Sequence, residues 1–154
     1  MGIKLLAVGD LHIGRLPSRL PEAVAGRTFD YSPAAAWEKV VDDACDEGVD
    51  AVLLGGDVVE STHDFFEALP RLRSGMARLA AAGIRILAVS GNHDVEVLPR
   101  LASRIPECEL LGADGQWQCA QITGSDGQIV SVWVWSFPAL EVTQSPLTNF
   151  PGRE

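Results

Sequence analysis

The sequence predicts an α/β protein built on a parallel sheet, and two observations carry this prediction. Short apolar runs alternate with longer segments of helical periodicity up to about residue 111, which is the βαβαβαβ pattern of a parallel sheet covered by helices. Three of the apolar runs end in glycine followed closely by an acid or an amide, in the stretches AVGD, LLGGD and AVSGNHD. With 154 residues, 47% of them hydrophobic, we expect one domain.

Each element of the parallel part has its own local signal. Strands are expected at residues 3–8, 50–56, 84–89 and 109–111. A loop rich in Gly, Pro and Arg, residues 14–31, leads to a first helix that opens at Ser32-Pro33, an N-cap followed by proline, and stops near Gly48.

The second helix, roughly residues 64–82, is predicted from apolar side chains at three- and four-residue spacing and ends at Gly83. These side chains are Phe66, Leu69, Leu72, Met76 and Leu79. A short helix is expected at 98–104.

The pattern changes after Gly112. Residues 116–123 and 128–136, separated by GSDG, predict an antiparallel hairpin. Alternation in its second arm places valines on one face and Trp133 and Trp135 on the other, so that both faces need cover. Open apolar edge strands invite pairing with another chain, and we therefore expect the isolated chain to dimerise or aggregate through this edge.

Charge and cysteine content narrow the function classes. The net charge of −9 disfavours loose, sequence-independent binding to nucleic acid. Residues 41–67 hold nine acidic side chains and no Lys or Arg, whereas residues 68–104 hold six Arg and two acidic side chains. An acidic region beside a basic one suits metal ions next to a phosphate ligand. The simpler interpretation is that the two regions are solvated helix faces. The three cysteines form no CxxC pair, and the first residues resemble neither a signal peptide nor a membrane span, so a cytoplasmic protein with no membrane partner is expected.

The polar residues at the strand ends form a plausible metal-ligand set. The carboxyl ends of parallel strands line up along one edge of a sheet, so Asp10, Asp57 and Asn92 should converge. His12 lies two residues after Asp10, about 6 to 7 Å along an extended backbone, and its side chain would point to the same side. Two carboxylates, an imidazole and an amide oxygen suit Mn²⁺, Fe²⁺ or Zn²⁺.

The same residues suggest a reaction. If Asp57 bridges two ions roughly 3.5 to 4 Å apart, they can generate a hydroxide and clamp an in-line displacement at phosphorus. His93 is then free to protonate the leaving oxygen, with Asp94 as a supporting carboxylate. Taken alone, each Gly-Asp pair has the simpler explanation of turn chemistry.

The stretches GDLHIG, GGDVVE and GNHD together resemble the first three motifs of the calcineurin-like metallophosphoesterases. Within that superfamily the chain most resembles the SbcD-like DNA repair exonucleases. The resemblance implies Asp10, His12, Asp57 and Asn92 as ligands, usually of two Mn²⁺, and His93 as the residue that contacts the scissile phosphate. It also implies Glu60 as a residue that orients this histidine.

The resemblance covers only the N-terminal half of the family's four-layer αββα sandwich. The family completes its site with a further histidine and a Gly-His-x-His motif, whereas no histidine follows His93 here. Residues 1–154 are therefore expected to be a calcineurin-like phosphoesterase domain truncated before those motifs, with weak or single-metal binding by this chain alone.

Three hypotheses about the function follow from these observations. The first is a metal-dependent phosphodiester hydrolase, a DNA exonuclease or endonuclease of the SbcD type, which for the full-length protein implies an SbcC-like ATPase partner. Arg15 and Arg19, in the loop after His12, would then bind substrate along the DNA backbone. The second is a catalytically incomplete fragment or binding module. The third is a phosphatase or phosphodiesterase for a small substrate, which the overall acidity favours.

Overall fold

The computed structural model describes residues 2–16 and 20–152. Four parallel strands form one sheet in the order β1-β2-β3-β4, and two antiparallel strands form a separate hairpin. The strands are Leu5–Val8 (β1), Ala51–Leu54 (β2), Arg85–Ala88 (β3), Cys108–Leu110 (β4), Gln118–Thr123 (β5) and Ile129–Val134 (β6). The helices are Pro33–Glu47 (α1), Phe65–Ala81 (α2) and Leu98–Ala102 (α3). The predicted α/β class, with a parallel sheet followed by a hairpin, is confirmed.

The first helix begins and ends where local chemistry requires. The Ser32 hydroxyl accepts a hydrogen bond from the Ala35 backbone N–H, and Pro33 stands at the first helical position, where its missing N–H costs nothing. The helix ends at Gly48, which takes the left-handed conformation with φ of 58°.

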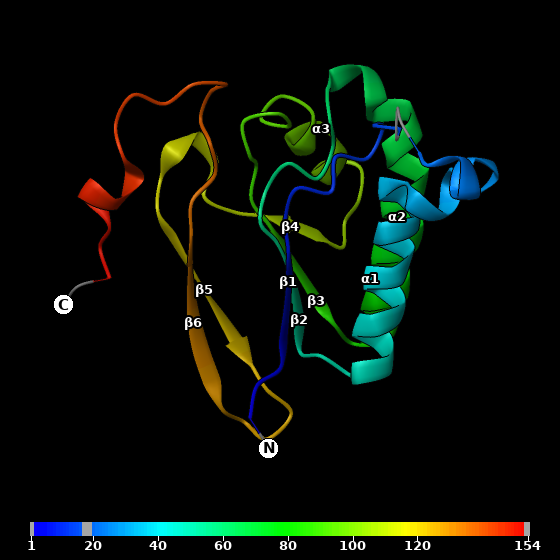
Figure 1. Ribbon diagram of the computed structural model, residues 1–154. Coiled ribbons are helices and arrows are strands. Elements are labelled where there is room, and N and C mark those ends of the chain that lie inside the picture. The colour runs from blue at the N-terminus through cyan, green and yellow to red at the C-terminus, as the bar shows by residue number, and fades with distance from the viewer. Residues whose placement is uncertain (1, 17–19, 153–154) are drawn as a thin grey trace.

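The sheet is covered on both faces (Figure 1). The helices α1 and α2 lie against one face and the hairpin β5-β6 lies against the other. Alternation along β2 decides which residue faces which layer: Val52 and Leu54 pack with the helices, and Ala51 and Leu53 pack with the hairpin. The hairpin contributes Ala120 and Ile122 to that second layer.

The valines of β6 pack toward the sheet, as their alternation predicts. On the other face of the hairpin, Trp117 and Trp133 both contact the ring of Phe150 edge-on, with ring centroids 4.8 and 5.8 Å apart. The segment after β6 therefore folds back over the tryptophan face and covers part of it.

Two expectations need correction. The loop 14–31 contains two short 3-10 helices, Glu22–Arg27 and Phe29–Tyr31, in its described part. Phe66, predicted for the buried face of α2, is 83% exposed, and its neighbour Phe65 is the buried residue. The spacing itself favours Phe65, because it lies seven residues before Leu72 and is in phase with the buried side of α2, whereas Phe66 lies about 100° further around the helix. Among the residues described, no helix is both long and apolar enough to cross a bilayer.

Candidate active site

The loops after β1 and β2 run side by side beyond the ends of the strands. The backbone N–H of Asp10 donates to the carbonyl of Gly56, and that of His12 donates to Asp57. A further isolated bridge joins Ile13 to Val59. Leu11 and Ile13 are buried in the core, and Asp10 and His12 are left to form the site.

Asp10, His12 and Asp57 bring their side chains together through an unusual backbone. Their φ angles are 54°, 51° and 51°, in the left-handed region that non-glycine residues rarely adopt. Such conformations cluster at functional sites, where the surrounding structure enforces them. The expectation that Asp10 and His12 lie on an extended segment is thus wrong, yet Nε2 of His12 still lies 3.7 Å from Oδ1 of Asp10.

These three residues fit a divalent metal ion. One ligand atom of each lies within 4.8 Å of the ligand atoms of the other two. Asp10 is strongly exposed, whereas His12 is mostly buried and held in place. Two carboxylates and an imidazole are donors that Mn²⁺, Fe²⁺ and Zn²⁺ accept.

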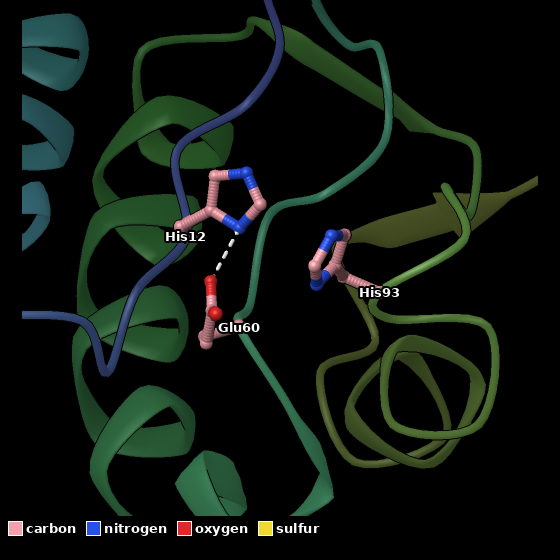
Figure 2. A group of neighbouring side chains, drawn as sticks. All are labelled: His12, Glu60 and His93. Atoms are coloured by element: carbon pink, nitrogen blue, oxygen red, sulfur yellow. Dashed lines mark ion pairs between the residues drawn. The ribbon is translucent and has the colours of Figure 1, made fainter. Parts of the chain in front are cut away.

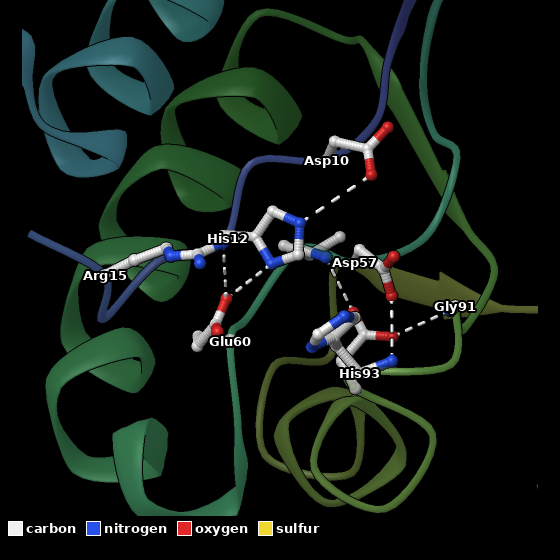
Figure 3. A network of polar contacts seen from close by, with 9 residues as sticks. Asp10, His12, Arg15, Asp57, Glu60, Gly91 and His93 are labelled. Carbon is white, nitrogen blue, oxygen red and sulfur yellow. Dashed lines mark hydrogen bonds and ion pairs between the residues drawn. The ribbon is translucent and has the colours of Figure 1, made fainter. Parts of the chain in front are cut away.

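The carboxylate of Glu60 contacts the Nδ1 atom of His12 (Figure 2). Oε2 of Glu60 lies 2.7 Å from Nδ1 of His12. The other ring nitrogen, Nε2, points toward Asp10 (Figure 3). The contact is close but not aligned as a hydrogen bond, since neither atom has a hydrogen-bond partner among the described residues. A carboxylate beside the second ring nitrogen is the arrangement that orients a metal-binding histidine. Arg15 approaches the same carboxylate oxygen at 3.8 Å.

The loop after β3 brings His93 to this cluster (Figure 3). Its backbone N–H donates to Oδ1 of Asp57 at 2.9 Å, and its ring meets that of His12 edge-on with centroids 5.0 Å apart. His93 also has a ligand atom within 4.8 Å of those of His12 and Glu60. Asn92 and His93 line an open hollow of about 530 Å³ that also borders His63.

Asp94 lies beneath the loops. It is fully buried, and its two oxygens accept hydrogen bonds from the backbone N–H groups of Val58 and Gly91, each at 2.7 Å. Burial raises the pKa of Asp94 above its usual value, and the two backbone hydrogen bonds act in the opposite direction. Because neither oxygen faces the hollow, this carboxylate joins the second loop to the third and positions their residues.

Two glycines let the loops approach closely. A Cβ on Gly91 would lie 2.1 Å from Oδ1 of Asp57, and one on Gly56 would lie 2.8 Å from the Gly91 nitrogen. Gly56 also has a φ of 95°. A side chain at Gly91 would push Asp57 out of place, and one at Gly56 would push away the backbone of Gly91.

The structure thus brings together Asp10, His12, Asp57, Glu60 and His93, with Asn92 on the adjoining hollow. Glu60 was expected to orient His93, but its close contact is with His12. Arg15 lies at the edge of the cluster, and Arg19 falls outside the described residues.

The comparison with protein families agrees with this geometry. Residues 3–138 match the family model of the calcineurin-like phosphoesterases. The chain belongs to this family. The DNA double-strand break repair protein Mre11 of Haloferax volcanii is 39% identical over 94 residues, which are 59% of this chain and 19% of that protein. Mre11 of Methanosarcina mazei is 25% identical over 152 residues, 99% of this chain and 22% of the relative.

A third relative, the uncharacterized metallophosphoesterase YhaO of Bacillus subtilis, is 34% identical over 77 residues, half of this chain and 19% of that protein. This calcineurin-like phosphoesterase chain therefore spans only about a fifth of the length of these curated relatives. Among solved structures, the nuclease MPE of Pseudomonas putida matches with a TM-score of 0.46 and 19% identity, over 70% of this chain and 46% of that one. A dimetal phosphatase from Danio rerio matches with a TM-score of 0.44 and 20% identity, over 68% and 35%.

Proposed function

We propose that this domain belongs to a metal-dependent phosphodiester hydrolase that acts on DNA. The observation that supports this most directly is the convergence of Asp10, His12 and Asp57 at the carboxyl edge of the sheet, with His93 beside them. Relatives named as Mre11 DNA repair proteins favour DNA as the substrate.

Asp10, His12, Asp57 and Asn92 are the proposed ligands of up to two divalent ions, with Mn²⁺ as the first choice and Fe²⁺ or Zn²⁺ as alternatives. Bound ions of this kind supply Lewis acidity and lower the pKa of water. Glu60 acts on this site through His12, whose imidazole it orients at a contact of 2.7 Å.

His93 is the proposed acid. Its ring stands next to that of His12, and its backbone is anchored to Asp57, so the imidazole is held beside the ligand cluster without belonging to its Asp10-His12-Asp57 group. An exposed imidazole at the mouth of the hollow can deliver a proton to a leaving oxygen. Arg15, at the edge of the cluster, is proposed to contact a phosphate of the substrate.

Two alternatives rest on specific observations. The cluster lacks the later histidines of the family pattern, which favours weak or single-metal binding and leaves a catalytically incomplete fragment or binding module as the second candidate. The net charge of −9 favours a small phosphodiester as substrate. An SbcC-like ATPase partner is proposed only for the longer protein, and dimerisation through the hairpin stays a prediction.

The test is Mn²⁺-dependent hydrolysis of bis(p-nitrophenyl) phosphate and of a labelled DNA oligonucleotide by the 154-residue chain. His93→Ala should abolish turnover of both substrates. Asp114→Asn is the control, because Asp114 is exposed and does not line the hollow, so turnover should be unchanged. Absence of Mn²⁺-dependent turnover, or equal loss in both variants, would contradict the proposal for this chain.

A further inference from the structure

An exposed phenylalanine and three arginines lie together on α2, on α3 and in the turn after α3, outside the proposed metal site. Phe66 is 83% exposed, although it lies at the start of a helix whose other side is fully packed. Its ring meets that of buried Phe65 edge-on, with centroids 5.3 Å apart. On the same buried ring stand the guanidinium groups of Arg100, at 4.9 Å from the centroid, and Arg104, at 5.9 Å.

Arg73 completes the group. Its guanidinium donates to the backbone carbonyl of Arg104 at 3.0 Å, and it lies seven residues after Phe66 on the same helix. Seven residues are about two turns, so Phe66 and Arg73 share one face of α2 roughly 10 Å apart. We call Phe66, Arg73, Arg100 and Arg104 the Phe66 patch.

The arginines of the patch have no acidic partners. Among the described residues, neither Arg73, Arg100 nor Arg104 forms an ion pair, whereas Arg71 and Arg78 on the same helix pair with Glu67 and Asp42. All three are exposed, in a chain of net charge −9. A local group of uncompensated cations on an acidic protein is suited to an anionic partner.

The patch lies next to the proposed active site. The hollow that holds Asn92 and His93 is lined by Thr62 and His63, which directly precede α2, and by Glu96, which precedes α3. Figure 1 shows α3 and the first turns of α2 at the same end of the sheet as the strand ends that carry the site. A polymer that occupies the hollow can therefore continue onto the patch.

We propose that the Phe66 patch binds a single-stranded stretch of nucleic acid next to the site, with a base stacked on Phe66 and phosphates on the three arginines. The proposal rests on the proposed function, since it assumes a polymeric phosphodiester substrate. An aromatic ring beside cationic side chains is how proteins hold unpaired strands, because every base offers a face for stacking and every nucleotide a phosphate. A duplex hides the faces of its bases and would use only the arginines.

Binding of a fluorescent oligo(dT) in EDTA, followed by anisotropy, tests the patch without any metal chemistry. Phe66→Leu keeps apolar area but removes the stacking surface, and we expect affinity to fall about tenfold, while Phe66→Trp retains or improves it. Leu147→Ala, at another exposed apolar residue, should change nothing. Each of Arg73→Gln, Arg100→Gln and Arg104→Gln should reduce the slope of log Kd against log salt by about 0.7. Arg78→Gln is the matched control on the same helix.

The outcomes test the Phe66 patch and the proposed hydrolase function separately. Loss of oligo(dT) binding in the patch variants, with hydrolysis of bis(p-nitrophenyl) phosphate unchanged, supports the patch. Absence of oligo(dT) binding by the unmodified chain, binding indifferent to Phe66→Leu, or equal affinity for a duplex would overturn it. Hydrolysis of the small diester and of the labelled DNA oligonucleotide that persists in any of those cases would leave the proposed function intact.

Discussion

Removal of the buried Asp94 carboxylate should loosen the connection between two loops of the site. Its oxygens accept hydrogen bonds from the backbone of Val58 and Gly91, each at 2.7 Å, and the side chain has no exposed surface. Val58 follows Asp57, and Gly91 precedes Asn92. The carboxylate therefore fixes the positions of residues in both loops.

The magnitude follows from the two bonds. A hydrogen bond to a charged group contributes about 1.5–3 kcal/mol, so loss of both would cost roughly 3–6 kcal/mol. Burial of the carboxylate, which raises its pKa, offsets part of this. We expect Asp94→Ala to lower the free energy of unfolding by about 3 kcal/mol. Asp94→Asn retains one acceptor oxygen and leaves one buried N–H facing an amide NH₂, which should cost about 1–3 kcal/mol.

Urea unfolding followed by tryptophan fluorescence measures this directly, since Trp37 is buried in the core. Asp114→Asn is the control, because Asp114 is exposed and its φ of 57° suits asparagine equally well. It should stay within about 0.5 kcal/mol of the unmodified chain. If both Asp94 variants unfold at the same urea concentration as the control, the two bonds do not stabilise these loops and the reasoning fails.

Three other predictions concern the site and the core. Gly91→Ala should lower the free energy of unfolding by about 1–3 kcal/mol and weaken Mn²⁺ binding measured by calorimetry, because the new Cβ would clash with Asp57. Gly26→Ala is the control, since a Cβ there would meet nothing within 4 Å, and it should change neither stability nor Mn²⁺ binding. Glu60→Gln should weaken Mn²⁺ binding about 10- to 100-fold through His12, and unchanged affinity would rule out that support. Burial raises the pKa of Cys108 to about 11, so its thiolate fraction at pH 8 is roughly a hundredfold below that of an ordinary thiol. Mass spectrometry after iodoacetamide at pH 8 should show Cys119 labelled well before Cys108, and equal rates would contradict this.

Much of this architecture follows from local sequence. Ser32 and Gly48 mark the ends of α1 because a hydroxyl cap and a left-handed glycine act within a few residues of the chain. The alternation of short strands and helices requires a parallel sheet, and a parallel sheet aligns the carboxyl ends of its strands. The meeting of Asp10, Asp57 and the loop of His93 follows from that alignment, so the sequence alone was sufficient to predict that these residues lie together.

Only the tertiary structure decided how the residues of the site face one another. The positive φ angles of Asp10, His12 and Asp57 arise because the paired loops and buried Leu11 and Ile13 enforce them, against the preference of each residue alone. The contact of Glu60 with His12 likewise joins two loops that are distant in sequence. At the start of α2, Phe65 is buried and Phe66 is exposed beside the arginines. Helical phase places Phe65 with the buried residues of α2, whereas Arg100 and Arg104 come from a segment distant in sequence and reach this ring only because α3 packs beside α2.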